Sequence, residues 1–199
     1  MVNLILASSS PSRLRLLKSV GINPQVLVSG VDEESPEITA LAPSEMVLAL
    51  AIMKAHTVKE GAQADSLILG CDSTFEFNGQ SIGKPGSKEN AIANSKMLSG
   101  KYGYLHTGHC LIDLKKGIEL TERSTAKVSF AEMTDVEITD YVDSGEPINL
   151  AGGFSLDGLS APFITKIEGD PSGIIGLSLP LLRKMVISLG YNWPDLKNS

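Results

Sequence analysis

The chain has 199 residues, of which 42% are hydrophobic and 20% are charged, a composition typical of one globular unit with a sizeable core. Its formal net charge of −6 argues against a broad basic surface for nucleic-acid polymers, and no apolar stretch is long enough to cross a membrane. The two cysteines, Cys71 and Cys110, lack metal-ligand spacing and are too few for a disulfide framework. We therefore expect a soluble, cytoplasmic protein that folds as a single domain over residues 1–199.

A strand, a serine-rich turn and a helix are the first elements that the sequence predicts. The apolar run from Val2 to Leu6 predicts the strand, and the leucines after Pro11 predict a helix that stops at Gly21. A second strand is expected at Gln25 to Val28. After an acidic loop, the alanine-rich run from Met46 to Val58 predicts a buried helix.

The middle of the chain predicts mainly strands and hairpins. Ser66 to Leu69 predicts a short strand that ends at Gly70. A separate hairpin is expected around Asn78-Gly79, because both positions of such a turn need positive φ. Ser87 is expected to cap a helix that runs to about Ser99. Two long strands should then follow, at Tyr104 to Leu114 and at Ile118 to Phe130.

The last third of the chain predicts two helices around one strand. Thr134 and Glu137 form a capping box, in which each side chain satisfies a free backbone donor of the other. A strand is expected at Phe163 to Ile167, and a helix from about Pro180 to Leu189. Alternating strands and helices with a long central hairpin indicate an α/β fold whose sheet is mixed.

The serine-rich turn is the first candidate binding feature. Ser10 stands at the N-cap position and Pro11 at the first helical position, so free backbone N–H groups and the positive end of the helix dipole point at the space above the turn. Arg13 and Arg15 add positive charge beside it. The pattern fits a phosphate site and a well-made helix cap with surface arginines equally well.

Charged residues elsewhere supply the rest of a candidate site. Asp72 follows an apolar strand, where it could hold a cation, act as a base or merely form a turn. Lys54 lies in an otherwise apolar helix, where a lysine either reaches water or faces an anion. Lys84 is fixed between Gly83 and Pro85 in a hairpin, and Glu33 belongs to an acidic loop.

Taken together, these residues are the inventory of a metal-assisted phosphoryl or nucleotidyl transfer site. The glycine-rich run from 169 to 176 lacks the lysine of a P-loop, and the chain has no Gly-x-Gly-x-x-Gly dinucleotide motif.

In its motifs the chain resembles the Maf family of nucleoside triphosphate pyrophosphatases. The matching segments, in family order, are Leu6-Ala7-Ser8-Ser9-Ser10-Pro11 with Arg13, Val31-Asp32-Glu33, Lys54-Ala55, Gly70-Cys71-Asp72, Gly83-Lys84-Pro85, Leu98-Ser99-Gly100, Tyr141-Val142, Ser144-Gly145-Glu146-Pro147, Ala151-Gly152 and Ile175-Gly176-Leu177-Ser178-Leu179-Pro180. They cover nearly the whole chain. The resemblance implies two lobes around a twisted, elongated mixed sheet flanked by helices, as in inosine triphosphatases.

The resemblance also implies an activity and a set of roles. The family cleaves a nucleoside triphosphate between its α and β phosphates with a divalent cation, Mg²⁺ or Mn²⁺. Asp72 falls on the catalytic aspartate, and Glu33 with Asp72 would hold the metal. The other residues expected to bind substrate are Ser8, Ser10, Ser12, Arg13, Lys54, Ser73, Lys84 and Asp157. An aspartate with a pKa of about 3.9 is a poor base for free water, whereas a metal can lower the pKa of bound water towards about 7.

Two positions bear on the choice of base. The pyrimidine-preferring branch of the family has two adjacent arginines after the proline, whereas this chain has Ser12 before Arg13. That branch has a glutamine where this chain has Asp157, and the 7-methylguanosine-triphosphate branch has a carboxylate there. A carboxylate accepts both N1–H and the exocyclic amine of guanine, so we expect a guanine-type or 7-methylguanine base. The alternative is that Asp157, beside Gly158, only shapes a turn.

Competing functions remain open from the sequence. The family is associated with septum inhibition, so the chain could bind a nucleotide as a non-catalytic regulator of division, or it could sanitise the nucleotide pool. A phosphomonoesterase with the same basic pocket would release orthophosphate. The family resemblance further implies a homodimer. The net charge and the lack of a long apolar stretch predict no nucleic-acid or membrane partner.

Overall fold

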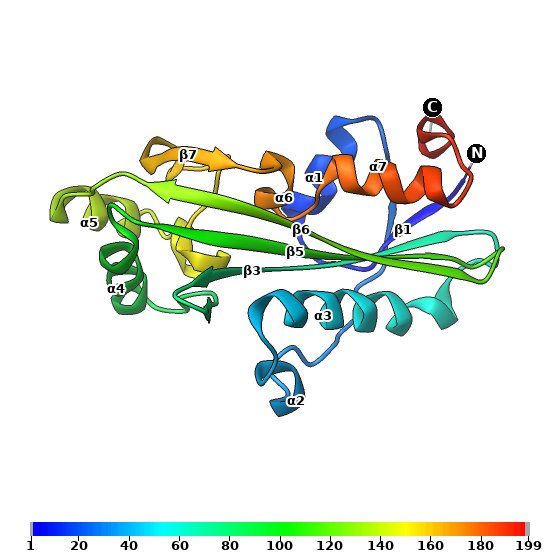
Figure 1. Cartoon of the computed structure of the whole chain (residues 1–199), viewed down its shortest axis with the longest axis horizontal. Coiled ribbons are helices and arrows are strands. Elements are labelled where there is room, and N and C mark those ends of the chain that lie inside the picture. The colour runs from blue at the N-terminus through cyan, green and yellow to red at the C-terminus, as the bar shows by residue number, and fades with distance from the viewer. Residues whose placement is uncertain (1, 198–199) are drawn as a thin grey trace.

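One long mixed sheet forms the centre of the molecule in the computed structural model, which describes residues 2–197 (Figure 1). Its strands are β1 (Leu4–Leu6), β2 (Gln25–Val26), β3 (Leu67–Phe77), β4 (Gln80–Ile82), β5 (Tyr102–Asp113), β6 (Ile118–Phe130) and β7 (Ile164–Glu168). They are ordered β2-β1-β3-β5-β6-β7, with β4 paired to β3. β1 pairs in parallel with β2 and β3, and all other pairs are antiparallel. The expected α/β fold with a mixed sheet is therefore confirmed, while residues 1 and 198–199 of the predicted domain lie outside the described residues.

Helices cover both faces of this sheet. The α-helices are α1 (Pro11–Ser19), α2 (Pro36–Thr39), α3 (Pro43–Thr57), α4 (Lys88–Leu98), α5 (Asp135–Asp143), α6 (Pro171–Ile175) and α7 (Leu179–Ser188). Short 3₁₀ turns are η1 (Lys59–Gly61), η2 (Glu146–Asn149), η3 (Ala151–Gly153), η4 (Ala161–Phe163) and η5 (Trp193–Leu196). α3 packs on one face, whereas α1, α6 and α7 lie on the other (Figure 1). Within residues 2–197, no helix is both long and apolar enough to cross a lipid bilayer.

The hydrophobic core is divided between the two ends of the sheet. One cluster joins β1, α1 and α7 through residues such as Leu6, Leu17 and Leu182. Another gathers Phe75, Phe130 and other side chains near α4 and β7. Figure 1 shows these groups of helices at opposite ends of the elongated sheet. The two-lobed arrangement expected from the resemblance is confirmed, with β3, β5 and β6 running through both lobes.

Several local predictions are confirmed. Ser10 accepts a hydrogen bond from the backbone N–H of Arg13, and Ser87 caps α4 in the same way. The capping box at the start of α5 is present. At the β3–β4 turn, Asn78 and Gly79 have φ values of 51° and 79°. The short helices α2 and α6 were not predicted, because they lie in polar loops of only a few residues.

The predicted end of a strand at Gly70 is wrong. β3 continues through Gly70, Cys71 and Asp72, because β5 pairs with it antiparallel across this whole stretch. A Cβ on Gly70 would lie 2.1 Å from the backbone oxygen of Ala51 in α3. The glycine therefore allows α3 to pack closely on the sheet and does not terminate the strand.

Candidate active site

The candidate site lies along an open edge of β3. β1 pairs with β3 only from Leu67 to Leu69, and β4 pairs with it only from Phe75 onward. Between these pairings β3 has β5 on one side, and no strand from residues 2–197 pairs with its other side. Asp72 and Ser73 lie in this gap, next to the turn that leads from β1 into α1.

Lys54 connects two carboxylates in this gap. Its Nζ lies 2.6 Å from Asp72 Oδ1 and 2.6 Å from Glu33 Oε1. Lys54 and Asp72 are buried, with relative exposures of only 6% and 7%. The close packing of α3 on Gly70 brings the lysine to the sheet. Of the two interpretations of Lys54, the structure therefore supports the one in which it faces anionic groups.

The two carboxylates differ in electrostatic state. Burial raises the pKa of Asp72 above its usual range, and the positive charges of Lys54 and Arg13 only partly oppose this effect. Burial also acts to raise the pKa of Glu33, but Lys54, followed by Lys84 and Arg13, outweighs it and lowers the pKa overall. Glu33 thus remains ionised more readily, while Asp72 is the better proton acceptor of the two.

Arg13 is the central cation of the α1 side. Its buried guanidinium donates hydrogen bonds to the Ser8 hydroxyl at 2.9 Å, to the Ser73 hydroxyl at 3.1 Å and to the Gly176 carbonyl at 2.8 Å. The serine-rich turn also has an internal bond, since Ser8 Oγ accepts from the backbone N–H of Ser10 at 3.2 Å. The structure therefore brings together Ser8, Ser10, Arg13 and Ser73, which were identified from different parts of the sequence.

Residues that the sequence did not identify hold this cluster in place. Thr107, on β5, lies 2.8 Å from the Ser73 hydroxyl and donates to the Gly173 carbonyl at 2.8 Å. Gly173 and Gly176 belong to the glycine-rich run that lacked a P-loop lysine. This glycine-rich run was the one feature of the sequence that could have indicated these contacts. It supplies two backbone carbonyls to the cluster.

Lys84 lies at the rim of the site. It is exposed, and its charge acts on Glu33 strongly enough to contribute to the lowered pKa of that carboxyl. The neighbouring Gly83 carbonyl accepts from the backbone N–H of Gly152 at 3.2 Å, which fastens the segment to η3. Lys84 is therefore near enough to Glu33 to act on its charge, and its role in binding phosphate stays a prediction.

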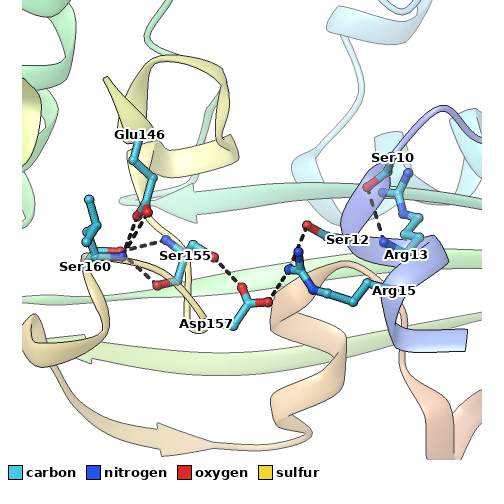
Figure 2. Close-up of polar contacts among 9 residues, drawn as sticks. Ser10, Ser12, Arg13, Arg15, Glu146, Ser155, Asp157 and Ser160 are labelled. Atoms are coloured by element: carbon cyan, nitrogen blue, oxygen red, sulfur yellow. Dashed lines mark hydrogen bonds and ion pairs between the residues drawn. The ribbon is translucent and has the colours of Figure 1, made fainter. Parts of the chain in front are cut away.

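A second group of polar residues lies beside the first turn of α1 (Figure 2). Arg15 forms an ion pair with Asp157 and approaches the Ser12 hydroxyl at 3.5 Å. Asp157 also accepts a 2.6 Å hydrogen bond from the Ser155 hydroxyl. Burial favours a higher pKa for Asp157, but Ser155 and then Arg15 outweigh it and lower the pKa. Arg15, expected to add charge beside the turn, is thus paired with a carboxylate 142 residues away.

Metal-binding capacity in this region comes from two carboxylates. Within residues 2–197, no group of three or more His, Cys, Asp or Glu side chains could hold a metal ion. Glu33 and Asp72 nevertheless direct one oxygen each at a common cation, the Lys54 ammonium. One or two carboxylates completed by phosphate oxygens and water are the usual ligands of Mg²⁺ in nucleotide enzymes. The donor set therefore fits a metal that arrives with a phosphate.

Comparison with known proteins identifies the family to which the chain is similar. The model of the Maf-like protein family matches residues 3–189. A nucleoside triphosphate pyrophosphatase from Streptomyces coelicolor is 50% identical over 97% of this chain and 93% of its own. Another, from Thermosynechococcus vestitus, is 48% identical over 100% and 99% of the two chains. A solved structure of a nucleoside-triphosphatase / dITP/XTP pyrophosphatase from Mycobacterium abscessus is more distant, with 16% identity over 94% of each chain and a TM-score of 0.45.

Proposed function

Since the chain belongs to the family of Maf-like proteins, we propose that it is a nucleoside triphosphate pyrophosphatase. It would hydrolyse a nucleoside triphosphate to the monophosphate and pyrophosphate. The observation that carries this proposal is the buried Asp72 carboxylate, placed at an open strand edge between the cations of Lys54 and Arg13. The names of the relatives from S. coelicolor and T. vestitus support the same reaction.

In the proposed complex, cations on three elements bind the triphosphate. Arg13 on α1, Lys54 on α3 and Lys84 after β4 would neutralise its negative charge. Ser8, Ser10, Ser12 and Ser73 would add hydroxyl or backbone donors beside it. Because Lys54 and Arg13 are already held by several partners, they need little reorganisation when the reaction develops charge.

Asp72 is the proposed proton acceptor. Water attacks the α-phosphorus and loses a proton to the Asp72 carboxylate while a new P–O bond forms. The bond from the α-phosphorus to its bridging oxygen breaks, and pyrophosphate leaves with the electron pair. The raised pKa of Asp72 in the metal-free site favours this role, since a more basic carboxylate accepts a proton more readily. A cation bound to Asp72 would lower that pKa, and the carboxylate would then mainly orient the attacking water.

We also propose that Glu33 and Asp72 hold a divalent cation, Mg²⁺ or Mn²⁺. When bound, such an ion would neutralise phosphate charge and make water more acidic. Its arrival would require Lys54 to exchange a carboxylate for a phosphate oxygen, because both carboxylates now contact that lysine. Because the ion would supply this charge neutralisation, omission of the metal from the assay should abolish turnover.

For the base, we propose a guanine-type ring that Asp157 recognises. Its carboxylate can accept from N1–H and the exocyclic amine, which guanine and 7-methylguanine both present. Replacement by asparagine should weaken such substrates by roughly 1–3 kcal/mol relative to pyrimidine nucleotides. Equal effects of Asp157→Asn on all nucleotides would show that Asp157 does not recognise the base.

A product assay tests the reaction directly. The protein is incubated with canonical and methylated nucleoside triphosphates plus Mg²⁺ or Mn²⁺, and released pyrophosphate and orthophosphate are measured separately. Asp72→Asn should lower pyrophosphate release by roughly 10²–10⁴-fold. Asp143→Asn, which removes an exposed carboxylate at the end of α5, is the matched control and should have no effect.

Other products of the same assay would contradict the proposal. Tight nucleotide binding without turnover would indicate a non-catalytic regulator, and orthophosphate alone would indicate a phosphomonoesterase. The family resemblance also supports a homodimer in the cytoplasm, with the nucleotide as its small-molecule partner.

A further inference from the structure

The first turn of α1 joins the two groups of candidate residues. Arg13 donates a hydrogen bond to Ser73 in the first cluster. Ser12 and Arg15, by contrast, lie towards the segment that contains Asp157 (Figure 2). A nucleotide whose phosphates contact Arg13 would therefore extend past Ser12 towards the ion pair of Arg15 and Asp157. Arg15 is thus in direct contact with the residue proposed to bind the base.

The segment that carries Asp157 is held in one conformation by its own hydrogen bonds. Glu146 accepts twice from the backbone N–H of Leu159, both at 2.9 Å. The Ser160 hydroxyl accepts from the backbone N–H of Ser155 and donates to the Ser155 carbonyl, both at 2.8 Å (Figure 2). Gly158 allows this packing, because a Cβ there would lie 2.6 Å from the Glu146 carboxylate oxygens. The position of Asp157 is therefore set independently of Arg15, and the arginine supplies mainly charge.

Both oxygens of Asp157 already have partners. Oδ1 accepts from Ser155, a neutral hydroxyl, and Oδ2 accepts from Arg15, a cation. Each carboxylate oxygen retains a further acceptor position, so a base edge can still bind to it. The incoming base, however, meets a carboxylate whose negative charge is already compensated by a guanidinium.

We propose that Arg15 is a specificity-determining residue, which compensates the charge of Asp157 and so favours a neutral guanine over a cationic 7-methylguanine. This inference rests on the proposed function. Hydrogen bonding alone does not separate the two bases, since both present the same donors to a carboxylate. Charge separates the two bases, because an uncompensated carboxylate attracts a cationic ring, whereas a guanidinium beside the carboxylate repels that ring.

The expected effect is modest because the pair is near solvent. The side chains of Arg15 and Asp157 have relative exposures of 61% and 30%. Ion pairs at such positions are screened by water and salt. We therefore expect loss of the Arg15 charge to change the preference between the two bases by roughly two- to five-fold.

The test compares kcat/KM for 7-methylguanosine triphosphate and GTP in the unaltered protein and five variants. Arg15→Gln should raise the ratio of the methylated to the unmethylated substrate, whereas Arg15→Lys, which keeps the charge, should preserve it. Lys18→Ala removes a positive charge one turn further along α1 and serves as the matched control. In an Asp157→Asn background, Arg15→Gln should again raise the ratio, because the guanidinium repels a cationic ring whether or not Asp157 is charged.

The outcomes separate this inference from the function on which it rests. An unchanged ratio in Arg15→Gln, with Asp157→Asn still altering base preference, would overturn the role of Arg15 alone. Equal loss of both activities would also overturn it, because that result indicates a structural role. If the unaltered protein releases no pyrophosphate from any nucleotide, the proposed function itself fails.

Discussion

The phosphate side and the base side of the candidate site are built in different ways. On the phosphate side, Lys54 and Asp72 are buried and Arg13 is held by partners on three segments. On the base side, Asp157 meets a single arginine that is 61% exposed. Triphosphate chemistry is common to all nucleotides and gains from fixed, desolvated charges. Under the proposed function, selection among bases would use a more exposed pair, whose alteration should not endanger the fold.

The largest expected effect comes from breaking the phosphate side at Lys54. Lys54→Met would leave the buried Asp72 carboxylate without its closest cation. Breaking a buried ion pair by removing one partner typically costs about 3–5 kcal/mol. We expect a loss of that size in the free energy of unfolding, measured by denaturant titration, together with loss of activity.

Two further variants sharpen this result. Lys88→Ala breaks an exposed pair with Asp143 and should change the free energy of unfolding by less than about 1 kcal/mol. The double variant Lys54→Met with Asp72→Asn should recover part of the stability, because the buried Asp72 charge is then removed together with its closest cation. If Lys54→Met is no more destabilising than Lys88→Ala, the buried ion pair of the phosphate side contributes no more to stability than an exposed one.

Lowering the pH should destabilise the fold beside the phosphate side, because it protonates His109. This buried ring accepts from the backbone N–H of Ser178 at 3.0 Å, close to the Gly176 carbonyl that binds Arg13. Burial and, next, the Arg13 charge lower the pKa of His109 to about 4 from an ordinary 6.5. The stabilisation from the neutral ring is therefore complete above pH 6.5 and lost as the pH falls through 4.

The measurement is the free energy of unfolding as a function of pH. Through this histidine alone it should fall by up to roughly 3 kcal/mol across that interval. His109→Gln keeps an acceptor for Ser178 but does not titrate, so its curve should be flatter there. Parallel curves for the two proteins would show that His109 does not link folding to pH.

Residues whose partners are near in sequence were predicted correctly. The caps at Ser10, Ser87 and Thr134 depend on contacts over three residues, and the structure confirms all three. The Asn78-Gly79 turn follows from the φ values that it needs. Lys54 was identified because a lysine among apolar residues is unusual, although its two partners were not evident from the helix itself.

Features that depend on packing were not predictable in the same way. Gly70 looked like the end of a strand, because its role is to admit α3, which the local sequence does not reveal. Arg13 reaches Gly176 across 163 residues, and Arg15 reaches Asp157 across 142. Family motifs placed Arg13 and Asp157 in the site, but nothing in them indicated that Arg15 and Asp157 form a pair.

The smallest expected effect comes from loosening the base side at Gly158. Gly158→Ala would place a methyl group against the Glu146 carboxylate, which must then move away from the backbone N–H of Leu159. Because Glu146 is a flexible side chain, the cost should be about 1 kcal/mol, the value of a typical hydrogen bond. Discrimination between GTP and UTP should fall, since Asp157 would no longer be held in place, while the rate with UTP should stay near that of the unaltered protein.

Glu146→Gln, which keeps one acceptor oxygen for Leu159, should have a smaller effect on discrimination. A large drop in activity with every nucleotide in Gly158→Ala would instead mean that the two sides are rigidly coupled, and that the base side is not an independently adjustable part of the site.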